Sequence, residues 1–210
     1  YDRGKVLTAA DLDSRKEKWG RYLDVDGDGI CYRTYPGSHP TKGSYFTRGT
    51  SHNEYSGYTE ESPIYQAGME RLLVKWQTAR RLVPTPRVKI RDQKSRLGAL
   101  FFGTTSQAAY EAIDTLQAGG VAINTLRLRA FPFQDEVTDF INRHTAIFII
   151  EQNRDGQLRT LLLSEGNFPP EKLLSVLNFD GLPVTATAIV ARIQRLLPKP
   201  LPDTTDGGQA

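Results

Sequence analysis

Ala146-Ile147-Phe148-Ile149-Ile150 is the stretch of sequence that decides the fold, because it is apolar without interruption. A strand of this kind has no polar face, which is typical of a parallel sheet covered by helices on both sides. The sequence around it alternates between short apolar runs and segments in which apolar residues recur at helical spacing. The other expected strands are Leu97–Phe102, Val121–Leu128 and Leu173–Phe179.

Helical spacing of apolar residues fills the gaps between these strands. The expected helices are Gln107–Ala118, a segment through Val137, Phe140 and Ile141, Asp155–Ser164, and Thr185–Leu197. Strand and helix therefore alternate four times along the chain. Because consecutive parallel strands need crossover connections, this order predicts an α/β three-layer sandwich with a mainly parallel sheet.

The segments outside this α/β domain, which we expect over residues 97–197, differ from it in composition. Residues 1–61 are polar, aromatic and glycine-rich, with no sustained periodicity, and we expect a loop-rich segment there. A helix and a charged, proline-bearing linker are expected over residues 62–96. Residues 198–210 are rich in proline, glycine and aspartate, and we expect a flexible tail.

The helix expected at the beginning of residues 62–96 has recognisable start and stop signals. Ser62 suits the cap position and Pro63 suits the first helical position. Pro84 and Pro86 end the helix. Its apolar face comprises Tyr65, Met69, Leu72, Leu73, Trp76 and Ala79.

Composition limits the classes of function. Among 210 residues, Lys and Arg exceed Asp and Glu by only three, with no block of like charge, so we expect no nucleic-acid surface. No apolar run reaches membrane-spanning length. The single Cys31 excludes an intrachain disulfide or a four-cysteine metal or iron–sulfur site, and so little cysteine favours the cytosol. Because the chain starts at Tyr1 without an initiator Met, we expect a segment of a longer protein.

A second stretch of interest, from Cys31 to Glu54, gathers cations, hydroxyls, glycines and aromatic rings. Its prolines and glycines exclude a regular helix. An arginine in such a loop can offer a carboxylate or phosphate two parallel hydrogen bonds, and a neighbouring threonine can donate one. The alternative is a solvated linker with ordinary surface charge. Composition alone leaves both interpretations open.

The acidic loop Asp24-Val25-Asp26-Gly27-Asp28-Gly29-Ile30 resembles a calcium-binding loop, since its carboxylates alternate before a glycine. The twelfth position, where such a loop needs a bidentate glutamate, holds Tyr35. The alternative is a tight turn in which Asp side chains accept from nearby backbone amides. We reject its Gly-Asp-Gly as a thiamine-diphosphate motif, because no buried strand precedes it.

Polar residues 151–155 directly follow the buried strand, at the end of a parallel sheet where ligands and partners collect. The alternative is an exposed strand-to-helix turn capped by Asn153 or Asp155. The three histidines are too far apart in the sequence to indicate zinc, and no nucleophile elbow occurs. We therefore expect no metal site, no catalytic residue and no complete active site within this chain.

Several of these motifs together resemble one protein family. They are Val25-Asp26-Gly27-Asp28-Gly29-Ile30, Tyr32-Arg33-Thr34, Pro36-Gly37, Thr47-Arg48-Gly49-Thr50, His52 and Glu151-Gln152-Asn153-Arg154-Asp155. In order and spacing they are similar to the alpha subunit of 2-oxoacid:ferredoxin oxidoreductases, especially the 2-oxoglutarate type. The resemblance implies the C-terminal portion of such a subunit. Residues 1–61 would be the tail of a pyrimidine-binding domain, and 97–197 a domain resembling the C-terminal domain of transketolase.

The resemblance also implies an activity that needs a multisubunit complex. Such an enzyme cleaves a 2-oxoacid oxidatively, joins the acyl group to coenzyme A and passes electrons to ferredoxin. Thiamine diphosphate, Mg²⁺ and an iron–sulfur cluster are expected mainly on the partner beta subunit and none on this segment, which alone would be inactive. The implied location is the cytoplasm, without membrane association.

The resemblance assigns roles to individual residues. Arg33 carries over to the arginine that lines the 2-oxoacid pocket, with Thr34 or Thr41 as the nearby threonine. Candidates for partner or ligand contacts are Arg48, Thr50, His52, Asn153 and Arg154. The rival hypothesis is a non-catalytic docking domain that only holds a larger assembly together. A Cys31–Glu54 loop packed entirely against its own chain favours docking, whereas an exposed Arg33 favours the substrate role.

Overall fold

The computed structural model describes residues 2–197, so the tail expected at 198–210 lies outside the described residues. The chain divides between Val83 and Pro84 into two compact units. We call the N-terminal one unit 1 and the C-terminal one unit 2. Between residues 2 and 197, none of the helices combines the length and the apolar character that crossing a membrane requires.

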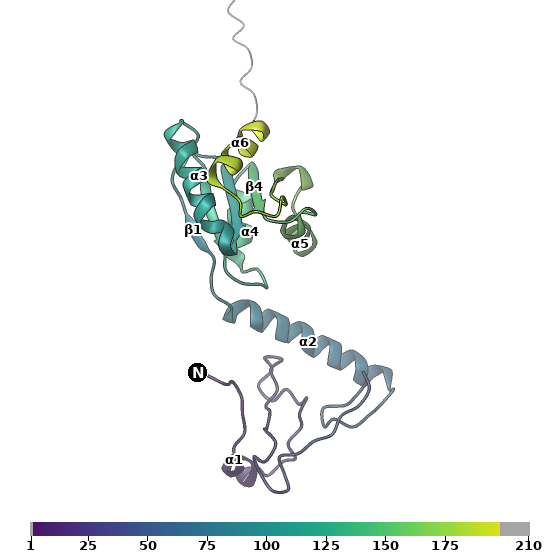
Figure 1. Ribbon diagram of the computed structural model, residues 1–210. Helices are drawn as coiled ribbons and strands as arrows, with labels where there is room; N and C mark the ends of the chain where they lie inside the picture. Colours follow the sequence, from purple (N-terminus) through teal and green to yellow (C-terminus); the bar gives the residue numbers. More distant parts are fainter. Residues whose placement is uncertain (1, 198–210) are drawn as a thin grey trace, which may run out of the picture. The chain divides into compact units, whose positions relative to one another are not determined.

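Unit 2 contains a five-stranded sheet in the order β1-β3-β2-β4-β5 (Figure 1). Its strands are β1 (Arg87–Lys89), β2 (Leu97–Phe102), β3 (Asn124–Leu128), β4 (Ala146–Glu151) and β5 (Leu173–Leu177). Strands β2 to β5 run parallel, and Leu100 of β2 lies opposite Leu126 of β3 and Ile149 of β4. The mainly parallel sheet predicted from the sequence is therefore confirmed.

Strand β1 pairs with β3 in the antiparallel sense and forms one edge of the sheet. It comes from the segment expected to be a linker, so that expectation is wrong for Arg87–Lys89. All of its residues are exposed, and Val88 lies between two cations. Such an edge strand lacks the apolar alternation on which a strand prediction depends, and its charges discourage pairing with other chains.

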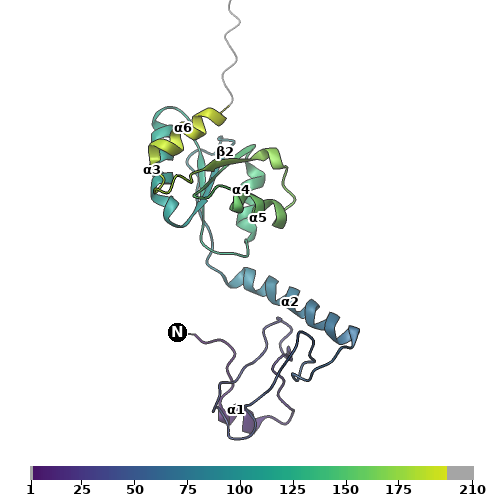
Figure 2. The same ribbon diagram turned by 45° about the vertical axis from the view of Figure 1, so that its right-hand side comes forward.

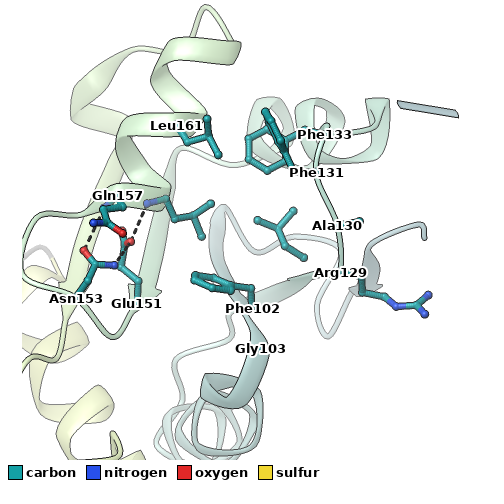
Figure 3. Close-up of a pocket in the computed structure, with 12 residues that line it drawn as sticks. Phe102, Gly103, Arg129, Ala130, Phe131, Phe133, Glu151, Asn153, Gln157 and Leu161 are labelled. Carbon is teal, nitrogen blue, oxygen red and sulfur yellow. Dashed lines mark hydrogen bonds between the residues drawn. The ribbon is translucent and has the colours of Figure 1, made fainter. Parts of the chain in front are cut away.

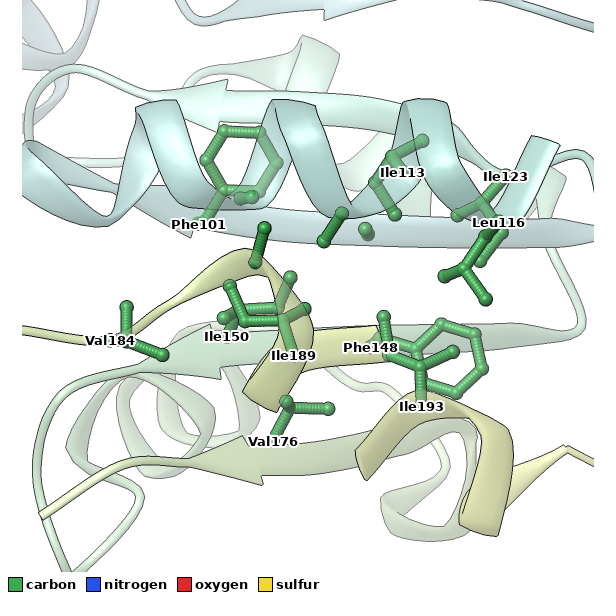
Figure 4. Packing of buried hydrophobic residues seen from close by; sticks show 14 residues of the cluster. Phe101, Ile113, Leu116, Ile123, Phe148, Ile150, Val176, Val184, Ile189 and Ile193 are labelled. Atoms are coloured by element: carbon green, nitrogen blue, oxygen red, sulfur yellow. The ribbon is translucent and has the colours of Figure 1, made fainter. Parts of the chain in front are cut away.

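Helices cover both faces of the sheet (Figure 2). One face is covered by α3 (Ser106–Ala118) and α6 (Ala186–Leu196), and the other by α4 (Asp135–Arg143) and α5 (Gln157–Glu165). Successive strand residues point to opposite faces. Phe101 and Ile150 therefore enter the cluster under α3 and α6 (Figure 4), whereas Leu100 enters the cluster under α4. Burial on both faces explains why these strands are apolar throughout.

A buried polar pair joins the start of β3 to the end of α4. The Nδ1 of His144 lies 2.6 Å from the carbonyl oxygen of Phe140, and its Nε2 lies 3.0 Å from the side-chain nitrogen of Asn124. A neutral imidazole satisfies both contacts, donating through Nδ1 and accepting at Nε2. Burial lowers the pKa of His144, and nearby cations, Arg143 first among them, lower it further. The histidine is thus a neutral structural link.

Unit 1 is mostly irregular and contains α1 (Ala9–Ser14) and α2 (Ser62–Leu82) (Figure 1). The first helix begins with a capping box in which Thr8 and Asp11 satisfy each other's backbone amides. The second begins where the sequence predicted, but Glu61 is its N-cap and makes no side-chain cap bond. The prediction of Ser62 as the cap is therefore wrong by one residue, and Pro63 still lies in the first turn, where its missing N–H costs nothing.

Few apolar side chains are buried in unit 1. Among residues 2–83, the buried apolar residues are Leu7 and Leu12. The predicted apolar face of α2 forms but is exposed, with Leu72 at 42%, Leu73 at 68% and Trp76 at 41% exposure. A unit with so small a core and so much exposed apolar surface is typical of a segment that packs against a further surface.

Candidate functional site

The acidic loop is held in a tight turn by hydrogen bonds from its own backbone amides and by ion pairs with a lysine. Asp24 accepts from the backbone N–H groups of Gly27 at 3.0 Å and Gly29 at 2.8 Å. The Nζ of Lys5 lies 2.6 Å from Asp26 Oδ2 and 2.8 Å from Asp28 Oδ1. Burial acts to lower the pKa of Lys5, but hydrogen bonds to the two carboxylates outweigh it and raise the pKa above its usual value. The tight-turn interpretation is therefore the one that the geometry supports.

The same loop is fixed on α2. Arg71 donates through Nη1 to the carbonyl of Gly29 at 2.9 Å, and Thr78 donates through Oγ1 to the carbonyl of Asp28 at 2.7 Å. Gly29 has φ +76°, and a Cβ there would lie 2.3 Å from the backbone nitrogen of Lys75. The second glycine of the motif is thus required for the contact with the helix. Among residues 2–197, no group of three or more His, Cys, Asp or Glu side chains is placed to hold a metal ion.

Arg33 is exposed, while its backbone is fixed. Its N–H donates to the carbonyl of Lys5 and its carbonyl accepts from Leu7, both at 2.9 Å. Its guanidinium lies 5.5 Å from the centre of the Tyr35 ring and donates through Nη2 to the carbonyl of Arg3. Because a guanidinium has five N–H donors, most of them remain available to an incoming carboxylate.

The two candidate threonines lie in different surroundings. Thr34 is buried and donates its hydroxyl hydrogen to the carbonyl of Gly43 at 2.5 Å, so that hydrogen is already used within the chain. Thr41 is exposed and lines a cavity of about 510 Å³ in unit 1. The lining of that cavity does not include Arg33 or Thr34. The structure therefore does not bring all three predicted substrate residues into one cavity.

The cavity that Thr41 lines, which we call the basic pocket, was missed by the sequence analysis. Its cationic lining residues are Arg15, Lys16, Lys18, Arg21 and Lys42. The sequence contains no block of like charge, yet folding gathers these five cations around one cavity, and the expectation of no nucleic-acid surface stays a prediction. The signal lies in residues 15–21, where four cations are interrupted by Glu17, Trp19 and Gly20 and so form no block of like charge.

The other candidates in unit 1 make internal contacts. The His52 ring stacks on Tyr22, with ring centres 3.8 Å apart and planes 21° from parallel, and it lines a separate cavity of about 390 Å³. Arg48 lies over the ring of Tyr58 at 5.7 Å. Thr50 is exposed. These contacts give His52 a structural role and leave the partner-contact role of all three residues a prediction.

In unit 2, a cavity of about 430 Å³ opens at the carboxyl ends of β2, β3 and β4 (Figure 3). Its walls include Phe102, Phe131, Phe133 and Leu161, so most of the lining is apolar. Asn153 and Glu151 lie at its polar side (Figure 3). The position agrees with the rule that places ligands beyond the carboxyl ends of parallel strands.

The buried carboxylate of Glu151 organises the turn into α5. Its Oε2 accepts from Asn153 Nδ2 at 2.7 Å and from the backbone N–H of Leu158 at 2.8 Å. The N-cap position of the helix is Gly156, not Asn153 or Asp155. Asn153 Oδ1 nevertheless accepts from the backbone N–H of Gln157, the first residue of the helix, at 3.2 Å, so the turn alternative holds for the Asn153 side chain. Arg154 is exposed and pairs with Asp155 at 2.7 Å. Glu151 was missed as a cap because its partner lies seven residues further along the chain.

Comparisons with known proteins give one match in sequence and several matches in fold. No family model matches the chain. The alpha subunit of 2-oxoacid:ferredoxin oxidoreductase 2 from Aeropyrum pernix is 26% identical over 199 residues, covering 93% of this chain and 29% of that protein. The solved 2-oxoglutarate:ferredoxin oxidoreductase from Magnetococcus marinus, with 2-oxoglutarate, coenzyme A and succinyl-CoA bound, matches with a TM-score of 0.75 and 19% identity. That match covers 87% of this chain and 31% of the solved chain.

Two further solved structures match about half of the chain. A split-gene transketolase, as an inactive β4 tetramer, has a TM-score of 0.41 and 20% identity, and covers 52% of this chain and 40% of its own. The alpha chain of a probable 2-oxoacid ferredoxin oxidoreductase from Thermoplasma acidophilum has a TM-score of 0.37 and 18% identity, and covers 53% of this chain and 96% of its own.

The sequence match and the shared α/β fold relate this chain to a subunit of an oxidoreductase. More specifically, the chain is homologous to the alpha subunit of 2-oxoacid:ferredoxin oxidoreductase. It spans slightly less than a third of the length of the first relatives it matches, 29% of one and 31% of the other.

Proposed function

We propose that this chain is part of the alpha subunit of a 2-oxoacid:ferredoxin oxidoreductase that converts 2-oxoglutarate and coenzyme A to an acyl-CoA, with electrons passed to ferredoxin. The observation that carries the proposal is homology to such a subunit along 93% of the chain. The substrate assignment is supported by the exposed Arg33 in the Tyr32-Arg33-Thr34 stretch.

Arg33 is suited to hold the distal carboxylate of a dicarboxylic 2-oxoacid. Its backbone is fixed on both sides by Lys5 and Leu7, and its guanidinium is oriented by the carbonyl of Arg3 and the ring of Tyr35. An oriented guanidinium loses less side-chain freedom on binding than a flexible ammonium does. The Thr41 hydroxyl has no bond of its own among those described for residues 2–197. Thr41 lines a cavity that does not include Arg33, so a hydrogen bond from Thr41 to the same carboxylate stays a prediction.

The second part of the proposal is a contact with the beta subunit. Unit 1 exposes the apolar residues of α2 together with Phe46, which is 79% exposed. Apolar surface of this extent on a segment with a small core is typical of a permanent interface. The same observation supports the docking hypothesis. The docking hypothesis and the substrate-binding hypothesis therefore differ in whether Arg33 contributes to turnover.

Within residues 2–197 no acidic, histidine or cysteine cluster suits Mg²⁺ or an iron–sulfur cluster. We propose that these groups and thiamine diphosphate lie mainly on the beta subunit, where thiamine diphosphate supplies the carbanion chemistry of decarboxylation. The part of this chain is then to bind and orient the substrate, in the cytoplasm.

The test is activity with and without the beta subunit. The full-length alpha subunit, co-expressed with its beta subunit, should reduce a viologen dye when 2-oxoglutarate and coenzyme A are both present. This chain alone should not. A stable complex that turns over no 2-oxoacid would contradict the enzymatic proposal and leave docking as the function. Robust turnover by this chain alone would contradict the assignment of the chemistry to the complex.

A further inference from the structure

The basic pocket of unit 1 concentrates positive charge. Its lining contains five cationic side chains against one carboxylate, that of Glu17. Five cations minus one carboxylate give the lining a net charge of +4, whereas the whole chain has a net charge of +3. Like charges around a concave surface repel one another, and they raise the local concentration of anions.

Several of these cations are held by aromatic rings rather than by carboxylates. The ammonium of Lys18 lies 5.0 Å from the centre of the Tyr55 ring, and the guanidinium of Arg21 lies 5.8 Å from that of Tyr45. A ring orients a cation through its quadrupole but leaves the charge in place. By contrast, Lys42 pairs with Asp13 at 2.7 Å. The pocket therefore keeps positive charge that an anion can neutralise.

Trp19 supplies an independent sign of a missing partner. It lines the pocket, and its indole Nε1 is buried without a hydrogen-bond acceptor among the described residues. A buried N–H without an acceptor is unfavourable and rare in native structures. The ring is held edge-on to Tyr45 at 5.7 Å, so the indole cannot turn outward without losing that contact. Because the N–H itself is buried, an acceptor atom of a ligand in the pocket would reach it after a shift of the side chains around it.

The size and the aromatic lining narrow the ligand class. A volume of about 510 Å³ exceeds what a small carboxylate alone would fill, and three aromatic residues, Trp19, Tyr45 and Tyr55, face it. Aromatic faces bind planar bases by stacking, and clustered Lys and Arg bind phosphates. We propose that the basic pocket binds a nucleoside phosphate, with its phosphates among the cations and its base against the aromatic rings. The proposal does not depend on the oxidoreductase function.

Two kinds of ligand contain a nucleoside phosphate, a free nucleotide and coenzyme A. The experiment uses Trp19 emission as the signal. The chain has two tryptophans, so Trp76→Phe leaves Trp19 as the reporter. ADP, inorganic diphosphate, adenosine and coenzyme A are titrated into the intact protein. ADP should quench the emission and bind more tightly than diphosphate or adenosine. Tighter binding of coenzyme A than of ADP would identify the coenzyme as the source, and equal binding would identify the free nucleotide.

Matched variants distinguish binding in the basic pocket from non-specific attraction of ADP to surface cations. Lys16→Glu with Lys18→Glu should weaken ADP binding by about tenfold or more, since each reversal replaces an attraction to phosphate by a repulsion. Lys89→Glu with Lys94→Glu makes the same change of charge outside the pocket lining and should leave the affinity within about twofold. Trp19→Phe, followed by calorimetry, should weaken binding through loss of the indole donor alone. Thermal unfolding of each variant checks that it is folded.

Three results would overturn the proposal. Equal losses of affinity in the pocket and control variants would show non-specific attraction. Absence of ADP binding, or binding of ADP no tighter than that of diphosphate, would show that the aromatic rings take no part. Much tighter binding of an RNA oligonucleotide than of ADP, lost in the same variants, would make the pocket part of a nucleic-acid surface.

Discussion

Replacing Arg33 with Met should change the substrate selectivity of the full complex. Met keeps much of the length of the side chain and its contact with Tyr35, but it removes the charge and the donors. 2-Oxoglutarate has a distal carboxylate that can lose its partner, and pyruvate has none. We therefore expect the Michaelis constant to rise for 2-oxoglutarate and to change little for pyruvate.

The size of this change in selectivity depends on how far the partner subunit shields Arg33 from water in the complex. In this chain Arg33 is exposed, and a carboxylate paired there would gain only about 0.2–1 kcal/mol. Covered by a partner subunit, a charge-assisted pair that loses one member costs about 2–5 kcal/mol. Since about 1.4 kcal/mol is tenfold, the ratio of kcat/KM for 2-oxoglutarate to that for pyruvate should fall by at least about tenfold.

The assay is steady-state dye reduction by the reconstituted complex with each substrate. Arg48→Met is the matched control, because Arg48 also lies over a tyrosine ring, at 5.7 Å against 5.5 Å for Arg33. That control should leave the ratio within about twofold. Equal slowing of both substrates by Arg33→Met would assign Arg33 to the fold or to the interface and refute the substrate role. Unchanged kinetics for both would identify the loop as a solvated linker.

Three further predictions concern stability. Gly29→Ala should destabilise unit 1 by more than about 2 kcal/mol, because the new Cβ would meet the backbone of α2. Gly27→Ala should cost about 1 kcal/mol, because Gly27 has φ +71° but no atom within 4 Å of the new Cβ. Equal losses of stability in urea unfolding would refute the contact argument. The melting temperature of unit 2 should fall as the pH drops below about 6.5, because burial lowers the pKa of His144, so that the unfolded chain takes up the proton first and folding is favoured above that pH. His144→Gln should flatten this pH dependence, and an unchanged slope would contradict it. Residues 84–197 should unfold cooperatively when expressed alone, since both faces of their sheet are covered; a broad, non-cooperative trace would place the boundary elsewhere.

The α/β unit could be predicted because its signals are local. The runs Leu97–Phe102 and Ala146–Ile150 are buried on both faces, so each residue carries the apolar signal and the boundaries match within one residue. Strand β1 could not be predicted, since its residues are all exposed and carry no apolar alternation, and its pairing with β3 is made far along the chain. The cap of α5 was missed for a similar reason: Glu151 reaches across seven residues to Leu158.

The site was less accessible to sequence reasoning than the fold. Lys5 and Asp28 are far apart in the chain and meet only once the loop is folded, so the sequence alone left the acidic loop open between a calcium site and a turn. The basic pocket joins residues of 12–21 with others from 41–55. Four of its five cations lie within residues 15–21, but Glu17, Trp19 and Gly20 interrupt them, so they form no block of like charge. Arg33 was found because of the family resemblance, and its exposure in the structure supports that choice without testing its role.

The most direct test of the central claim is the product balance of the purified complex of the full-length alpha subunit and its beta subunit. With 2-oxoglutarate labelled at its first carbon, coenzyme A and oxidised ferredoxin, we predict that labelled CO₂, succinyl-CoA and reduced ferredoxin form together in fixed proportion, and that omission of coenzyme A lowers all three. Formation of CO₂ without ferredoxin reduction, or the absence of turnover in an intact complex, would contradict the account.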